Sequence, residues 1–281
     1  MANYTAADIK ALREKTGAGM MDVKKALDEA DGDQSKAIEF LRVKGLKGAT
    51  KREGRSTSDG LVATQIDGGV GTMIELNSET DFVAKSDPFV ALAEEVLALA
   101  VAENADSAEA VLASTKDGKP VSEFITESGA TLGEKVALRR VGRLEGASVE
   151  SYLHRTNKDL PPQVGVLLAY EGDDASVAHD VAVHIAAMSP KYFSRDEVPA
   201  ELVENERRIA EDTAKNEGKP EKALPKIIEG RVNGFFKENC LLDQGFAKDP
   251  KQSVSKVLEA AGVKATGFLR FRVGALSTID R

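Results

Sequence analysis

Residues 71–102 read GTMIELNSETDFVAKSDPFVALAEEVLALAVA, and this stretch decides the fold. GTMIEL has the composition of a buried strand, and DPFVALAEEVLALAVA places apolar residues at helical spacing after an Asp-Pro start. Residues 165–188, GVLLAYEGDDASVAHDVAVHIAAM, repeat the order of strand, polar connection and helix. We interpret the two stretches as an internal duplication of one α+β unit.

The first copy begins with a predicted hairpin, in which GLVATQI and GTMIEL flank Asp67-Gly68-Gly69. A second short helix is expected near residues 108–112, before a turn at residues 117–120. These elements predict a first core subdomain over residues 60–133.

The second copy is expected to form a subdomain over residues 134–281. Three strands are predicted from a set of apolar residues, which are Val136, Leu138, Val149, Leu153, Val164, Val166 and Leu168. Residues 197–238 predict a helical hairpin that bends at Gly218 and Pro220, with Ile209 on its apolar stripe. GFLRFRV predicts a strand over residues 266–273 that returns to the second sheet.

Residues 1–45 predict a small module of three helices. Thr5 and Asp8 form a capping-box pattern, Gly17 and Gly19 break the first helix, and Asp33 is a candidate N-cap. Gly45 is expected to end the third helix. Residues 46–59 are then a linker, which is either a solvated tether or a basic contact for RNA or an acidic partner.

The composition narrows the classes of function. The chain has 281 residues, a formal net charge of −8, 5% aromatic residues and no Trp, which disfavours nucleic-acid binding by stacking or by bulk charge. The sole cysteine, Cys240, excludes an intrachain disulfide. No apolar run approaches the roughly 20 residues that span a bilayer, so we expect a cytoplasmic protein.

The ionisable residues form no recognisable active site. His179 and His184 are not at the spacing of a helical metal pair, and Cys240 has no motif around it. The stretch TGAG at residues 16–19 follows a predicted helix, unlike a phosphate loop. We therefore expect no catalytic residue, metal or cofactor, although sequence does not exclude a carboxylate site.

Two segments resemble the signatures of a known family. LREKTGAGMMDVKKAL at residues 12–27 and ELNSETDFVAK at residues 75–85 closely resemble those of elongation factor Ts, and the likeness extends over nearly the whole chain. The resemblance implies an α+β protein. It would have an N-terminal three-helix ubiquitin-associated-like bundle, then a duplicated core of two antiparallel sheets with helices and an inserted helical hairpin.

The resemblance also implies a function in translation elongation. The family provides the guanine-nucleotide exchange factor for elongation factor Tu: it binds the GDP-bound and nucleotide-free forms, weakens magnesium and phosphate contacts, and promotes GDP release and GTP loading. No nucleic-acid or membrane partner is expected. The hairpin is a candidate surface for a weak homodimer. The alternative is an RNA-binding or chaperone-like module, which the acidic net charge disfavours.

Individual residues match family positions. The segment that pushes on the GTPase near its magnesium site matches Thr80, Asp81, Phe82 and Val83. Phe82 is then an exposed wedge, the alternative being a core ring, and Asp81 would also cap the helical turn that follows. Further partner-binding positions match Lys10, Arg13, Met20, Met21 and His154. The methionines are alternatively core residues, and His154 is alternatively a solvated surface imidazole.

Overall fold

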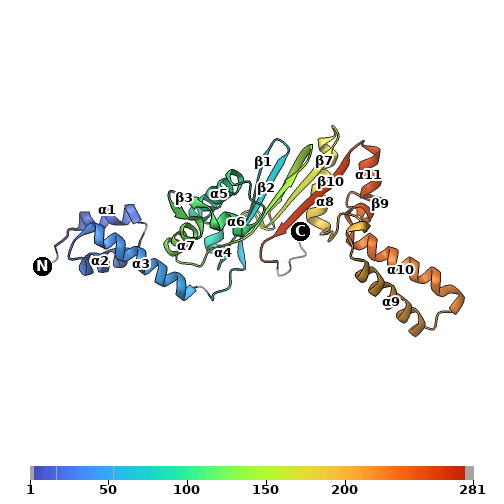
Figure 1. The fold of residues 1–281 in the computed structure, drawn as a ribbon, viewed down its shortest axis with the longest axis horizontal. Helices are drawn as coiled ribbons and strands as arrows, with labels where there is room; N and C mark the ends of the chain where they lie inside the picture. Colours follow the sequence, from blue (N-terminus) through green and yellow to red (C-terminus); the bar gives the residue numbers. More distant parts are fainter. Residues whose placement is uncertain (1–2, 17, 53, 276–281) are drawn as a thin grey trace. The chain divides into compact units, whose positions relative to one another are not determined.

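The computed structural model describes residues 3–16, 18–52 and 54–275, and it describes no side chain between residues 45 and 52. Three N-terminal helices precede a mixed core of antiparallel sheets and helices, so the protein is α+β as predicted (Figure 1). Within the described residues, no helix is both long and apolar enough to cross a membrane.

The N-terminal module consists of α1 (Ala6–Thr16), α2 (Met20–Glu29) and α3 (Gln34–Arg52). The predicted capping box forms, because Thr5 N donates to Asp8 Oδ2 at 2.7 Å and Asp8 N donates to Thr5 Oγ1 at 3.3 Å. Asp33 caps α3 by accepting from Lys36 N at 3.0 Å. The small shared core comprises Leu12, Val23, Ala26, Leu27, Ala30 and Ala37.

The prediction that Gly45 ends the third helix is wrong. Helix α3 continues to Arg52, so the first half of the expected linker is helical. Glycine in a helix costs only about 1 kcal/mol relative to alanine, and α3 lies against α7 (Val121–Leu132), a tertiary contact that local propensity does not reveal. Gly17 lies outside the described residues, as do the side chains of Lys47, Lys51 and Arg52.

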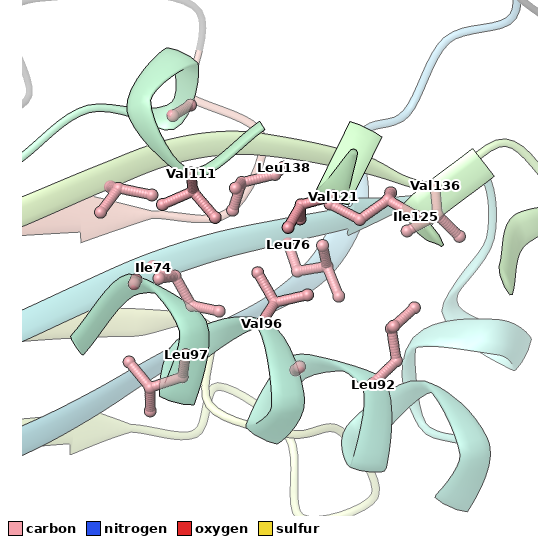
Figure 2. Packing of buried hydrophobic residues seen from close by; sticks show 14 of the residues in the cluster. Ile74, Leu76, Leu92, Val96, Leu97, Val111, Val121, Ile125, Val136 and Leu138 are labelled. Atoms are coloured by element: carbon pink, nitrogen blue, oxygen red, sulfur yellow. The ribbon is translucent and has the colours of Figure 1, made fainter. Parts of the chain in front are cut away.

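The first core copy is a three-stranded sheet in the order β1-β2-β5. Its strands and main helix are β1 (Asp59–Asp67), β2 (Val70–Ser78), β5 (Ala137–Glu145) and α5 (Asp87–Ala102). Between α5 and β5 the chain forms α6 (Ala108–Ala113), a two-stranded sheet of β3 (Thr115–Lys116) and β4 (Lys119–Pro120), and then α7. Figure 2 shows buried side chains of β2, α5, α6, α7 and β5 pointing toward one another around Leu76 and Val96.

The second core copy is a three-stranded antiparallel sheet in the order β6-β7-β10. Its strands and main helix are β6 (Ser148–His154), β7 (Val164–Glu171), β10 (Lys264–Arg272) and α8 (Ala175–Met188). The central strand β7 pairs with both neighbours, since Leu168 lies opposite Glu150 on β6 and Phe268 on β10. Before β10 come β8 (Gly245–Phe246), β9 (Asp249–Ser253) and α11 (Val254–Ala260).

The two copies share one topology. In each, a hairpin leads to a long helix, then a two-stranded ribbon, a shorter helix and a third strand beside the central one. Both shorter helices are followed by a glycine with positive φ, which is Gly133 (φ 81°) after α7 and Gly262 (φ 64°) after α11. The next residue donates back in both, from Glu134 N to Gly129 O at 3.1 Å and from Val263 N to Leu258 O at 3.0 Å. The duplication therefore extends well beyond the stretches that show it in the sequence.

The boundary expected at residue 134 lies too early in the chain. Strand β5 pairs in the first sheet, and residues 74–142 belong to one compact unit with residues 1–63 and 155–163. The second unit comprises residues 64–73, 143–154 and 164–281. The apolar pattern at Val136 and Leu138 predicts a strand but carries no information about its partner.

The second copy carries a helical hairpin that the first lacks. Helices α9 (Ala200–Asn216) and α10 (Leu224–Asn239) lie side by side in the predicted span (Figure 1). Their buried residues include Ala210 and Ala214, whereas Ile209 is 47% exposed. Placing Ile209 on the buried stripe is therefore wrong, because the buried side of α9 carries small residues.

Candidate protein-interaction site

The connection between β2 and α5, residues 79–86, contains the one-turn helix α4 (Asp81–Ala84). Thr80 caps this helix, because its side chain accepts a hydrogen bond from Val83 N at 3.4 Å. Asp81 is the first helical residue, so the prediction that Asp81 is the cap is wrong. Thr80, Asp81, Phe82 and Val83 thus form a single hydrogen-bonded turn.

Phe82 projects from this turn into solvent. Its side chain is 73% exposed, so the alternative of a core ring is wrong. The same turn anchors itself through its other apolar residues, since Val83 packs against the first core and Ala84 is buried. Lys85 Nζ lies 4.7 Å from the centroid of the Phe82 ring, at the distance of a cation–π contact. The turn presents a large apolar ring on a fixed base.

A carboxylate from far along the chain braces the turn. Glu134 Oε2 accepts hydrogen bonds from Glu79 N at 3.0 Å and Thr80 N at 3.1 Å, and Glu134 Oε1 accepts from Thr80 Oγ1 at 2.5 Å. In return, Glu79 Oε1 accepts from Lys135 N at 2.6 Å. Arg55 lies 3.3 Å from the same Glu79 oxygen. Residues 79–80 and 134–135 therefore hold each other reciprocally.

Negative charge accumulates beside the turn. Burial, together with the nearby carboxylates of Asp81 and Glu134, raises the pKa of Asp59. Among the residues that the structure describes, no group of His, Cys, Asp and Glu side chains is arranged to hold a metal ion. The turn therefore combines an exposed apolar ring with a neighbouring cation and carboxylates.

The N-terminal module presents its candidate residues to solvent. Lys10 and Arg13 are exposed one turn apart on α1. Met20 and Met21 begin α2, and they are 56% and 74% exposed. Core packing of the two methionines is therefore wrong, and flexible thioether side chains are available for an adaptable apolar contact.

His154 is the last residue of β6 and is exposed. The Tyr152 hydroxyl lies 3.1 Å from His154 Nδ1, and the two ring centroids are 6.0 Å apart. His154 belongs to a different compact unit from the Phe82 turn. The structure thus gathers the four turn residues together but does not gather all the candidate residues on one element.

The other histidines and the cysteine have structural surroundings. His184 is fully buried, with Nε2 2.8 Å from Gln244 Oε1 and Nδ1 accepting from Ala247 N at 3.0 Å. Cys240 is also buried, and burial raises the pKa of its thiol to about 11. His179 lies at the surface, 3.2 Å from a carboxylate oxygen of Glu150. None of these surroundings resembles that of an activated nucleophile or base.

Sequence reasoning missed two residues of the site. Lys85 follows Phe82 by one helical turn, and this spacing could have indicated the contact. Glu134 lies 54 residues from Thr80 and has no motif around it. Only the paired strands β2 and β5 bring Glu134 and the turn together, so no local signal could have found it.

Comparison with known proteins identifies the family of this chain. The family described as "Elongation factor TS" matches residues 79–275, which begin at the braced turn. The chain is 67% identical over 278 residues to "Elongation factor Ts" of Arthrobacter sp. (strain FB24), covering 98% of this chain and all of the relative. It is 67% identical over 277 residues to "Elongation factor Ts" of Micrococcus luteus, with the same coverage. This chain belongs to the elongation factor Ts family.

Proposed function

We propose that this protein is a guanine-nucleotide exchange factor that acts on elongation factor Tu during translation elongation in the cytoplasm. It binds the GDP-bound and nucleotide-free forms of the GTPase and performs no covalent chemistry. Membership of the elongation factor Ts family supports this proposal. The observation that carries the mechanism is the Phe82 ring, which is 73% exposed on a helical turn that is held by hydrogen bonds to Glu134.

The proposed mechanism is differential binding. A GTPase holds GDP through backbone amides of its phosphate loop and a magnesium ion. Phe82 inserts into a gap that opens only when those contacts are distorted, and burial of such a ring is worth roughly 1.5–3 kcal/mol. Each roughly 1.4 kcal/mol of preference for the opened form lowers nucleotide affinity about tenfold.

The coupling is reciprocal. If this protein weakens GDP binding by some factor, GDP weakens the binding of this protein by the same factor. Fresh nucleotide therefore displaces the exchange factor, and GTP loads because it binds the vacated site. A wedge of moderate free energy is suited to this cycle, since a much stronger one would trap the complex.

The remaining candidate residues provide affinity. Lys10, Arg13, Met20 and Met21 form the contact of the N-terminal module, residues 1–45, and His154 contributes from the second core copy. Their exposure supports this assignment. The described residues fit a division of labour in which these side chains hold the partner and the Phe82 turn distorts it.

The test is Phe82→Ala, assayed by the release of fluorescently labelled GDP from elongation factor Tu. We expect the maximal release rate to fall by about tenfold to a hundredfold, which corresponds to the loss of one buried ring, while binding to the nucleotide-free GTPase weakens less. Met188→Ala is the matched control, because Met188 is also an exposed apolar residue, at 48%. Release at the wild-type rate by the Phe82 variant would exclude the wedge.

A further inference from the structure

Both carboxylate oxygens of Glu134 are used to hold the connection that carries Phe82. The three hydrogen bonds end on Glu79 N, Thr80 N and Thr80 Oγ1, at 3.0, 3.1 and 2.5 Å. Thr80 is also the cap of α4, so the carboxylate fixes the residue from which the helical turn starts. Hydrogen bonds to an ionised acceptor are shorter and stronger than neutral ones.

The second core copy has a residue equivalent to Glu134 but no helical turn for that residue to hold. Val263 follows Gly262 as Glu134 follows Gly133, with the same backbone hydrogen bond. Val263 is buried in the second core, and the corresponding connection, residues 172–174, contains no helix. An apolar residue therefore suffices for the repeated fold here. The carboxylate occurs in the copy that has an exposed helical turn, and its hydrogen bonds hold that turn in place.

We propose that Glu134 is a positioning residue for nucleotide exchange: it holds the Phe82 turn in the single orientation in which the ring projects outward. This inference rests on the proposed function. A ring on a loose turn must be ordered when it binds, and that entropy cost reduces the free energy available to distort the partner. Glu134 removes this cost in advance because it ties the turn to the segment that leads into β5.

The first experiment compares Glu134→Gln with wild type. Glutamine has nearly the same shape, but its amide nitrogen cannot accept a hydrogen bond, so part of the set of three hydrogen bonds to Glu79 and Thr80 is lost. We expect GDP release from elongation factor Tu to slow about tenfold, equivalent to about 1.4 kcal/mol. Glu134→Val, the residue of the second copy, removes all three bonds and should slow release further while the fold persists.

Glu95→Gln is the matched control. Glu95 belongs to the same compact unit, is 52% exposed and forms an ion pair with Lys116 at 2.5 Å, away from the turn. We expect its release rate to be unchanged. A comparable loss in the control variant would show that any carboxylate on this unit has the effect, and would overturn the special role of Glu134.

A double-mutant cycle with Phe82→Ala separates positioning from a general structural role. If Glu134 acts through the ring, the double variant Phe82→Ala, Glu134→Gln releases GDP as fast as Phe82→Ala alone. If the two losses multiply instead, Glu134 acts independently of Phe82 and the proposal is overturned.

Amide hydrogen exchange provides a readout that needs no partner. In Glu134→Gln, the amides of Glu79 and Thr80 should exchange faster, while those of the central strand β2 remain protected. Unchanged protection of these two amides would overturn the proposal. If the wild-type protein itself fails to accelerate GDP release, the proposed function fails. Faster amide exchange in the variant would then still show that Glu134 holds the turn, but the proposed role of Glu134 in nucleotide exchange would be rejected.

Discussion

The two core copies share a topology but differ in one connection. Between the central strand and the long helix, the first copy has residues 79–86 with helix α4, whereas the second has residues 172–174. The first connection exposes Phe82 and is braced by Glu134, while the second only caps a helix, through Asp174. A duplicated fold thus supplies two equivalent connections, and only the first carries an exposed aromatic ring on a turn that a distant carboxylate holds.

The difference shows where a repeated fold can acquire a function. The strands and helices of each copy must bury an apolar core, so their residues are constrained alike. A connection at the surface has no such constraint, provided that its backbone groups are satisfied. In the first copy Glu134 and Thr80 satisfy them, and the turn is free to present a side chain that contributes nothing to its own core.

The largest effect on stability is expected for Phe89, a buried residue of the first copy, in contrast with the exposed Phe82 of the same copy. Phe89 is fully buried in α5, so Phe89→Ala should lower the free energy of unfolding by about 3–5 kcal/mol. Urea denaturation followed by circular dichroism measures this. A loss below about 1 kcal/mol would mean that the first core tolerates a cavity, and the contrast with the surface turn would weaken.

A smaller effect concerns the buried histidine of the second copy. His184→Ala leaves Gln244 Oε1 and Ala247 N without their partner, which should cost about 1–3 kcal/mol at pH 7. Burial lowers the pKa of His184, with the Gln244 hydrogen bond opposing in part, so the neutral form is favoured in the folded protein.

This pKa shift predicts a pH dependence of stability. Because the folded pKa of His184 is lowered, its contribution is complete above the unfolded pKa of about 6.5 and is lost as the pH falls through the folded pKa. The difference in stability between wild type and His184→Ala should therefore shrink between pH 7 and pH 5. His179→Ala, on the exposed side of the same helix, is the control, and a difference that stays constant would contradict the prediction.

The connection of the second copy should matter for stability alone. Asp174 caps α8 by accepting from Val177 N at 3.1 Å, so Asp174→Ala should cost about 1 kcal/mol. GDP release from elongation factor Tu should remain at the wild-type rate. Thermal denaturation and the release assay together check this, and slower release would show that both connections take part in exchange.

The smallest expected effect is the stability of the Phe82 variant. Since the ring is 73% exposed, Phe82→Ala should change the free energy of unfolding by less than about 0.5 kcal/mol. The same urea titration as for Phe89→Ala gives the comparison directly. A loss near that of the buried ring would mean that Phe82 supports its own core, contrary to the wedge mechanism.

Much of the fold could be predicted from local patterns. The capping box at Thr5, the N-cap at Asp33 and the hairpin at Gly68 are short-range signals, and each forms as expected. Helix α7 was missed because VSEFITESGATL is rich in serine, threonine and glycine, and its buried stripe is short. Helix α3 continues through Gly45 and Gly48 because each glycine costs only about 1 kcal/mol and α3 lies against α7.

The sequence by itself determined the α+β class, the duplication and the family, because apolar periodicity and two long signature segments are properties of neighbouring residues. It also determined that Phe82 follows a strand in a polar connection. Only the tertiary structure decided that the ring faces solvent, that β5 joins the first sheet and that Glu134 braces the turn. These depend on which strands pair and which groups meet across long separations, and hydrogen bonds between distant residues leave no local pattern.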